Sequence, residues 1–237
     1  MKLLIVIPTL NESRNITIIY KKIIKLYSKA KILFIDDNSS DGSKKEIISL
    51  NKKNKNVAFI FRSHKFGIGS AHKLGINYAK KKGYDFICTM DCDGTHNPKT
   101  IKKMFKHTNK YPLIITTRFK KEKALDDWPL KRKIITKLRY NLVYLFLGTK
   151  LDGSGGFRLY DLRVIKIKDI LRALDNNYNF FWESTYILEK KYKIYEVPIK
   201  LPNRTLGLSK MKLKDLIVGI FYLIKIFFKY RVFNNSK

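Results

Sequence analysis

The sequence predicts a single α/β domain with a mostly parallel central sheet flanked by helices. Short apolar runs alternate with segments of helical spacing through the first half of the chain, which is typical of βαβ units on a parallel sheet. Polar clusters directly follow several of these runs, where sheets of this class bind their ligands. With 237 residues, 45% of them hydrophobic, the chain can bury one sizeable core.

Five apolar runs are the predicted strands of this sheet, and the absence of a polar face predicts that each is fully buried. They are Leu3–Ile7, Ile32–Ile35, Val57–Phe61, Phe86–Met90 and Leu113–Thr116. The stretches with helical spacing between them are Ile16–Tyr27, Ser43–Asn51, Gly69–Lys81 and Pro98–Thr108. Two of these helices have start signals, Asp41–Gly42 and Asn97–Pro98.

The pattern changes after Arg118. A basic, amphipathic segment and a glycine-rich segment are followed by a further helical pattern, and then by a stretch with Pro198 that resembles a pair of strands. These four segments are Lys131–Leu147, Asp152–Arg158, Asn179–Glu189 and Ile194–Arg204. No repeat or low-complexity linker interrupts them. We therefore expect one domain over residues 1–212 and an apolar C-terminal helix, Leu213–Phe233, within residues 213–237.

The chain carries 50 basic and 19 acidic residues, a net charge of +31, with an isoelectric point near 10.0. Such a charge attracts nucleic acid, anionic lipid or phosphorylated substrates, although scattered lysines are equally typical of a compositional bias. The sequence has no basic recognition helix with base-reading residues and no zinc spacing, so a nucleic-acid-binding protein is the remote alternative. Charge alone does not choose the partner.

Two features predict the compartment. Cys88 and Cys92 have no second pair and no nearby histidine partner, so neither a disulfide framework nor a zinc site is expected. The first apolar run ends at Pro8 and is too short for a signal peptide. We expect a reducing, cytoplasmic location.

The acidic pair Asp91 and Asp93 follows the fourth predicted strand. Two carboxylates one residue apart can share a hard cation with a diphosphate, because Mg²⁺ prefers oxygen ligands and retains substrate phosphates in its shell. The cation would also neutralise a departing nucleoside diphosphate. Taken alone, the pair is equally typical of a solvated turn.

Two other polar clusters follow the first and second strands. Asp37, in Asp36–Gly42, can accept a hydrogen bond from a nucleobase or ribose, while Asp41 caps the next helix. A rigid turn over Pro8–Glu12 directs Glu12 toward the same crevice. The chain has neither a dinucleotide-binding glycine fingerprint nor a P-loop, so a phosphate would be held by a metal and by arginines.

Seven motifs together resemble glycosyltransferase family 2, and more closely its dolichol-phosphate (polyprenyl-phosphate) mannosyltransferase branch. They span almost the whole chain, from residue 8 to about residue 212. The motifs are PTLNE at Pro8–Glu12, DDNSSDGS at Asp36–Ser43, FGIGSAHKLG at Phe66–Gly75, MDCDGTHNP at Met90–Pro98, WPLKRK at Trp128–Lys133, GGFRLY at Gly155–Tyr160 and RTLGLSK at Arg204–Lys210.

The resemblance implies a fold of the GT-A type and a nucleotide-diphospho-sugar donor, with GDP-mannose favoured and a UDP-sugar possible. It assigns the catalytic role to Asp91, Asp93 and Arg118, and a Mg²⁺ or Mn²⁺ ion to Asp91, Asp93 and Thr95. The implied donor-binding residues are Pro8, Glu12, Asp37 and Asp91. The implied acceptor-phosphate-binding residues are Arg118, Arg132, Arg204, Ser209 and Lys210.

One position departs from the family pattern. The family commonly has Gln where this chain has Thr95, whose hydroxyl can still ligate a hard ion but has a shorter reach. Metal preference and donor choice are therefore open. The adjacent His96 is interpreted as structural.

The acceptor decides whether the reaction needs a base. A sugar hydroxyl must lose its proton during attack, whereas a lipid monophosphate is largely dianionic near neutrality and needs cationic clamps. The implied arginines favour polyprenyl phosphate, attacked in line with inversion; a saccharide or protein hydroxyl is the alternative. Glu183 would be the base for that alternative, but we favour a positioning role for it.

The C-terminal apolar run, Leu216–Phe228, has 13 residues and contains Lys225. A membrane-spanning helix needs roughly 20 residues, so we expect a helix that lies at the surface of the cytoplasmic leaflet with Lys225 pointing outward. Lys131–Leu147 can make a second contact with the membrane. The alternative is that both helices cover the domain's own core. The sequence does not predict an oligomeric state.

Overall fold

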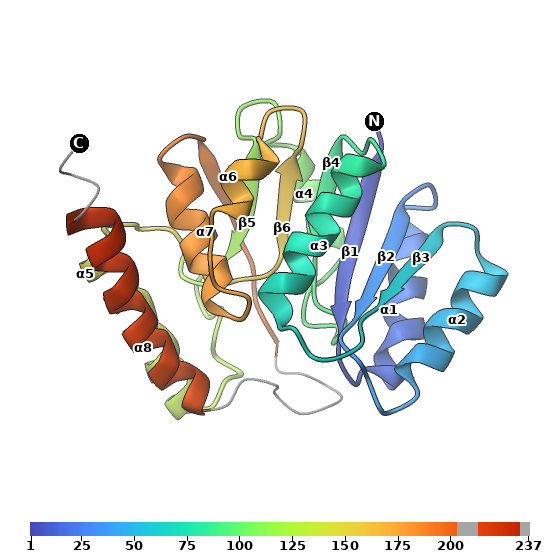
Figure 1. Cartoon of the computed structure of the whole chain (residues 1–237), viewed down its shortest axis with the longest axis horizontal. Coiled ribbons are helices and arrows are strands. Elements are labelled where there is room, and N and C mark those ends of the chain that lie inside the picture. Colours follow the sequence, from blue (N-terminus) through green and yellow to red (C-terminus); the bar gives the residue numbers. More distant parts are fainter. Residues whose placement is uncertain (203–212, 233–237) are drawn as a thin grey trace.

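The computed structural model describes residues 1–202 and 213–232. It is built around a seven-stranded sheet with helices on both faces (Figure 1). The strands are β1 (Leu3–Thr9), β2 (Lys31–Asp36), β3 (Val57–Phe61), β4 (Phe86–Thr89), β5 (Leu113–Thr117), β6 (Arg158–Asp161) and β7 (Ile194–Pro198). The helices are α1 (Ser13–Leu26), α2 (Ser43–Lys53), α3 (Ile68–Lys81), α4 (Lys99–Phe105), α5 (Leu130–Leu147), α6 (Ile167–Leu171), α7 (Asn179–Glu189) and α8 (Leu213–Phe227), which continues as a π-helical turn (Phe228–Val232).

The strand order is β3-β2-β1-β4-β6-β5-β7, and β6 alone runs antiparallel to its neighbours β4 and β5. This confirms the predicted fold class and the five predicted strands. The second half differs in two respects. The glycine-rich segment, for which no element was predicted, leads into the strand β6. The expected pair of strands in Ile194–Arg204 was wrong, because its described part contributes the single strand β7, parallel to β5. Residues 203 and 204 lie outside the described residues.

Two hydrophobic clusters fill the space on either side of the sheet, and alternate residues of each strand belong to opposite clusters. Leu4 and Val6 of β1 contact the side covered by α3 and α7, while Ile5 and Ile7 contact the side covered by α1 and α4. All four are essentially inaccessible to solvent, and burying each stabilises the fold by about 1.5–3 kcal/mol. Because both faces are covered, these strands have no polar side, as the sequence indicated.

The predicted helix start signals of α2 and α4 are confirmed. The Asp41 carboxylate accepts hydrogen bonds from the backbone N–H and the hydroxyl of Ser43, and the Asn97 side chain accepts one from the backbone N–H of Lys99 at 3.0 Å. Burial of Asp41 opposes its ionisation, but the hydrogen bonds from Ser43 and Ser13 outweigh burial and lower its pKa to about 2. Asp41 and Asn97, each one residue before the N-cap residue of its helix, therefore fix the loops that lead from the sheet edge into α2 and α4.

Helices α5 and α8 contact each other beside α7, at the end of the molecule away from β3 (Figure 1). Both carry exposed apolar side chains, among them Leu145 (71% exposed) on α5 and Phe221 (69% exposed) on α8. Within residues 1–202 and 213–232, no helix combines the length and the apolar character that crossing a bilayer requires. The division of the chain at residue 212 stays a prediction.

Candidate active site

A cavity of about 240 Å³ opens at the edge of the sheet where β1, β2 and β4 end. It brings together most of the residues that the sequence predicted for the site, although they come from distant parts of the chain. The predicted residues that line it are Pro8, Glu12, Asp37, Asp91, Asp93, Arg118 and Arg132. Arg204, Ser209 and Lys210 lie outside the described residues.

The loops after β1 and β2 are joined by hydrogen bonds. The backbone N–H of Asn11 donates to the Ser39 hydroxyl at 2.8 Å, and that of Glu12 donates to the Ser43 hydroxyl at 2.9 Å. Glu12 in turn accepts from the Asn15 side chain at 2.6 Å. Because each loop holds the other, the side chains on this part of the cavity wall have fixed positions before a ligand binds.

Asp37 is fixed by three donors. Its carboxylate accepts from the backbone N–H groups of Phe66 and Gly67 at 2.9 and 3.0 Å, and it pairs with the Arg62 guanidinium at 2.7 Å. Sequence reasoning missed Arg62, which also lines the cavity. Two carboxylate oxygens can accept about four hydrogen bonds, so Asp37 can be held in this way and still accept one from a ligand.

Gly67 is the N-cap residue just before α3 and has a φ of 96°, a conformation that L residues rarely adopt. A Cβ atom placed there would lie 2.4 Å from the carbonyl oxygen of Asn176. The glycine therefore allows the Phe66–Ile68 segment to approach the loop before α7. Gly67, Ile68, Asn177 and Tyr178 all line the cavity, so this approach shapes its wall.

The acidic pair lies after β4. Asp93 is 3% exposed, and its Oδ1 accepts from the backbone N–H and the hydroxyl of Thr95 at 3.0 and 2.7 Å. Asp91 is more open, with 30% of its side chain exposed. Thr95 does not belong to the cavity wall, and its observed contact orients Asp93. A direct metal contact by Thr95 stays a prediction.

His96 supports the same loop. Its Nδ1 accepts from the backbone N–H of Asp91 at 2.9 Å, and its ring stacks on Phe157. This geometry agrees with the structural interpretation of His96. No group of three or more His, Cys, Asp or Glu side chains gathers among the described residues in a way that could hold a metal by itself. Two carboxylates with an open cavity beside them fit a hard cation whose remaining ligands are diphosphate oxygens and water.

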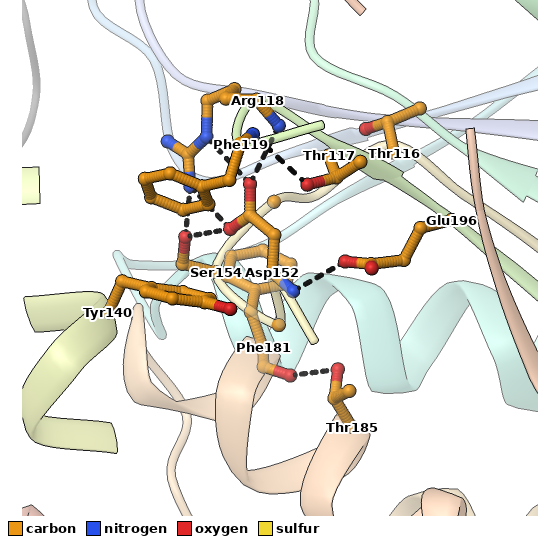
Figure 2. Close-up of polar contacts among 12 residues, drawn as sticks. Thr116, Thr117, Arg118, Phe119, Tyr140, Asp152, Ser154, Phe181, Thr185 and Glu196 are labelled. Atoms are coloured by element: carbon orange, nitrogen blue, oxygen red, sulfur yellow. Dashed lines mark hydrogen bonds and ion pairs between the residues drawn. The ribbon is translucent and has the colours of Figure 1, made fainter. Parts of the chain in front are cut away.

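Arg118 is engaged by Asp152, a partner that sequence reasoning missed (Figure 2). The Nε and Nη2 atoms of Arg118 donate to the two carboxylate oxygens of Asp152 at 3.0 and 2.7 Å, and Nη2 also donates to Ser154. Burial disfavours the charged guanidinium, but Asp152 outweighs burial, so the pKa of Arg118 is raised. Asp152 is held by its backbone N–H, which donates to Glu196 at 2.6 Å.

Arg132 lies over the indole ring of Trp128, with 3.5 Å between its Cζ atom and the ring centroid. Trp128 is itself fixed, because its Nε1 donates to the Leu201 carbonyl at 2.8 Å. The guanidinium of Arg118 lies 5.9 Å from the same ring. The stacked ring thus orients both arginines toward one part of the cavity.

Arg158 of β6 is a third residue that the sequence analysis did not single out, after Arg62 and Asp152. It is completely buried, and its guanidinium donates to the carbonyls of Gly153, Gly155 and Phe181 at 2.6–2.8 Å and to the Ser184 hydroxyl at 3.0 Å. These bonds order the glycine-rich segment, whose residues 154–156 line the cavity. Arg158 is therefore a positioning residue.

Glu183 does not line the cavity. It is completely buried and accepts from the backbone N–H groups of Leu174 and Asp175 at 2.9 and 3.1 Å and from the Tyr222 hydroxyl at 2.8 Å. These contacts fix the loop before α7 and attach α8 to α7. They fit the positioning role that we favoured and give no support for a catalytic base.

Residues 4–167 match the family model described as glycosyl transferase family 2. The chain belongs to glycosyltransferase family 2. The match covers more than half of the chain and agrees with the predicted resemblance, and the protein is therefore a glycosyltransferase.

Three curated relatives of this glycosyltransferase confirm the branch that its motifs resemble. The undecaprenyl-phosphate mannosyltransferase of Micrococcus luteus is 28% identical over 213 residues, covering 89% of this chain and 88% of the relative. The polyprenol monophosphomannose synthase of Mycolicibacterium smegmatis is 27% identical, covering 88% and 80%. The dolichol-phosphate mannosyltransferase of Saccharomyces cerevisiae is 28% identical, covering 90% and 82%.

Solved structures confirm the fold of this family 2 enzyme. Glucosyl-3-phosphoglycerate synthase from Mycobacterium tuberculosis, in complex with Mn²⁺, UDP and glucosyl-3-phosphoglycerate, superposes with a TM-score of 0.62 at 16% identity, covering 96% of this chain and 79% of that one. Mannosyl-3-phosphoglycerate synthase from Rubrobacter xylanophilus gives a TM-score of 0.63 at 15% identity, covering 100% and 75%. At these identities the likeness concerns the fold alone.

Proposed function

We propose that this glycosyltransferase transfers a hexose, with mannose favoured, from a nucleotide-diphospho-sugar to a polyprenyl phosphate, with inversion and with the help of a divalent metal. The observation that carries the proposal is one cavity lined both by the carboxylates of Asp91 and Asp93 and by the guanidiniums of Arg118 and Arg132. Such a cavity can receive two phosphate-bearing substrates side by side. The curated relatives named above, all of them polyprenyl-phosphate mannosyltransferases by name, support the acceptor class and the sugar.

The donor's nucleoside would lie against Pro8, Glu12 and Asp37, at the ends of β1 and β2. The carboxylates of Glu12 and Asp37 can accept hydrogen bonds from ribose hydroxyls or from base N–H groups. GDP-mannose is favoured because the relatives' names specify mannose, and a UDP-sugar remains the alternative donor.

The donor diphosphate would be held through Mg²⁺ or Mn²⁺ by Asp91 and Asp93, with Asp91 also contacting the donor. The fit rests on the two oxygen ligands that this pair offers to the cavity. When bound, the cation would neutralise the charge that develops on the departing nucleoside diphosphate. Thr95 keeps Asp93 oriented by donating to Oδ1.

The acceptor phosphate would be held by Arg118 and Arg132, together with Arg204, Ser209 and Lys210 as predicted from the sequence. Arg118 uses Nε and Nη2 on Asp152 and Ser154, so its Nη1 donors are the ones to serve a phosphate. A dianionic phosphate oxygen needs no base. It attacks the anomeric carbon in line as the bond to the diphosphate oxygen breaks, and the configuration inverts.

The lipid acceptor also gives α5 and α8 a role at a membrane surface. Their exposed apolar residues include Leu130, Ile134 and Leu145 on α5, and Ile217 and Phe221 on α8. Side chains of this kind can enter the headgroup region while the exposed Lys225 of α8 contacts anionic lipid. We place the enzyme on the cytoplasmic face of a membrane.

The test offers the purified protein one donor, radiolabelled GDP-mannose or UDP-glucose, with Mg²⁺ or Mn²⁺ and with undecaprenyl phosphate in detergent micelles. The expected product is an acid-labile, lipid-linked sugar with the anomeric configuration opposite to that of the donor. Undecaprenol and an oligosaccharide serve as matched acceptors without the phosphate. Transfer to these hydroxyl acceptors, with none to undecaprenyl phosphate, would refute the proposal.

A further inference from the structure

Arg139 lies on α5, seven residues and about two helical turns after Arg132, so the two side chains leave the same side of the helix. It is half-buried. Its side chain lines a second hollow, an apolar groove of about 220 Å³ between α5, α7 and α8, and also a small cavity beside Asp152 and Ser154. The mechanism above does not use it.

No carboxylate of the described residues lies within ion-pair distance of Arg139. Burial lowers the pKa of Arg139 to about 10, Arg118 adds to this effect, and Asp152 opposes it. The guanidinium is therefore still charged at neutral pH. Asp152, the acidic group that acts on it, directs its two oxygens to Arg118. Arg139 thus brings to the groove a positive charge that no carboxylate of residues 1–202 or 213–232 neutralises directly.

Two acidic side chains lie near the guanidinium of Arg139. Asp215 of α8 lines both the active-site cavity and the groove, and Asp152 pairs with Arg118. A dianionic phosphate that approaches through the groove therefore also meets these acidic side chains, and the guanidinium of Arg139, which lines the same hollows, offsets their negative charge.

The groove is continuous with the active-site cavity, because Tyr178 and Asp215 line both. Its other walls are largely apolar and include Leu138, Leu142 and Ile220. A cation beside an apolar groove complements a molecule with an anionic head and a hydrocarbon chain. Inorganic phosphate would interact only with the guanidinium of Arg139, and a neutral lipid would contact only the apolar walls of the groove.

We propose that Arg139 is an acceptor-binding residue: its guanidinium attracts the phosphate of polyprenyl phosphate toward Arg118 and Arg132, while the first isoprene units lie in the adjoining apolar groove. This inference rests on the proposed function and adds a residue and a route of entry to it. The groove orients the lipid so that its phosphate points toward the sugar donor.

The test compares Arg139→Gln with Lys137→Gln, which removes the same charge from an exposed position on the same helix. Binding of farnesyl phosphate, farnesol and inorganic phosphate is measured by calorimetry without donor, and KM is measured for undecaprenyl phosphate and for the sugar donor. Because a charge-assisted hydrogen bond to phosphate is lost, Arg139→Gln should weaken farnesyl phosphate binding and raise the acceptor KM by about tenfold. Farnesol binding, the donor KM and every value for Lys137→Gln should stay unchanged.

Arg139→Lys keeps the charge but loses the planar fork, and it should give an acceptor KM between those of the wild type and Arg139→Gln. This variant also covers the case in which Arg139→Gln fails to fold; an acceptor KM equal to that of the wild type would then overturn the inference. Equal acceptor KM values for Arg139→Gln and Lys137→Gln would overturn it as well. If the wild type itself transfers nothing to undecaprenyl phosphate, it is the proposed function that fails.

Discussion

Asp93 can lose its charge without losing the hydrogen bonds that hold it. Both donors from Thr95 point to Oδ1, and an asparagine side chain can keep a carbonyl oxygen at that place. The side chain is 3% exposed, and asparagine has nearly the same volume. We therefore expect Asp93→Asn to lower the free energy of unfolding by no more than about 1–3 kcal/mol, the cost of one poorly satisfied buried amide.

The effect on transfer should be far larger. Asp93 and Asp91 are the two cavity-lining carboxylates that we propose as metal ligands, so the substitution removes one of the two negative charges proposed to bind the cation. Stabilisation of the leaving group by a metal is worth several kcal/mol. A loss of about 4 kcal/mol corresponds to roughly a thousandfold lower rate.

The assay combines initial rates of lipid-linked sugar formation, calorimetric titration of GDP with Mn²⁺, and thermal melting of the same preparations. Asp126→Asn is the matched control, because it removes one charge from an exposed position. We expect Asp93→Asn to weaken metal-dependent GDP binding and to abolish measurable transfer, with the melting transition retained. Wild-type transfer by Asp93→Asn, or an equal loss in Asp126→Asn, would refute the reasoning.

Three further predictions concern Arg158, Gly67 and His72. Arg158→Met leaves three buried carbonyls without their donor, so urea unfolding should show a loss of about 3 kcal/mol or more, and a loss below 1 kcal/mol would contradict the positioning role. Gly67→Ala forces a Cβ to within 2.4 Å of the Asn176 carbonyl, so the donor KM should rise while the acceptor KM stays constant. His72 is completely buried, and burial, reinforced by Arg158 and His96, lowers its pKa to about 3. As the pH falls below about 6.5, only the unfolded chain binds a proton at this histidine, so the free energy of unfolding should drop by about 2 kcal/mol between pH 7 and pH 5. In urea titrations, His72→Gln should remove that part of the pH dependence.

The parallel part of the sheet could be predicted because its strands have their own local pattern. Leu3–Thr9 and Lys31–Asp36 are apolar runs that end in polar loops, and parallel order follows from the helices between them. Strand β6 has no such pattern, since its four residues begin with Arg158 and end with Asp161. Its antiparallel insertion between β4 and β5 depends on contacts that form only in the folded chain.

The candidate site could likewise be predicted only from local sequence features, and not from contacts that form when the chain folds. The family resemblance identified Asp37 and Arg118, but not the partners Arg62 and Asp152 that hold them. Each partner lies 25 or more residues away in the sequence, and no periodicity connects the two members of a pair. Aspartate in a glycine-rich segment was the one available signal for Asp152, and by itself it is also typical of an ordinary turn.

The glycine-rich segment 152–156 contacts both sides of the cavity. At one end, Asp152 contacts Arg118, on the proposed acceptor side, and Ser154 adds a second contact. At the other end, a Cβ atom on Gly156 would lie 3.4 Å from Oδ1 of Asp91, on the proposed donor side. The segment is held by Arg158 and by Thr89 of β4, whose hydroxyl donates to the Gly156 carbonyl at 2.7 Å. It therefore sets the separation between the groups that we propose to hold the leaving diphosphate and those that we propose to hold the attacking phosphate.

That separation matters because in-line attack is sensitive to the distance and angle between the reacting atoms, and displacements on the order of 1 Å can cost about a hundredfold in rate. Glycine lets the backbone lie close to Asp91 without a side chain in between, and the buried guanidinium of Arg158 replaces the rigidity that glycines lack. The glycine-rich segment can thus hold a fixed position, because Arg158 of β6 donates hydrogen bonds to its carbonyl groups. It follows that damage to Arg158 should lower kcat more than it raises either KM, because both substrates still find their own binding groups but no longer meet at the right distance.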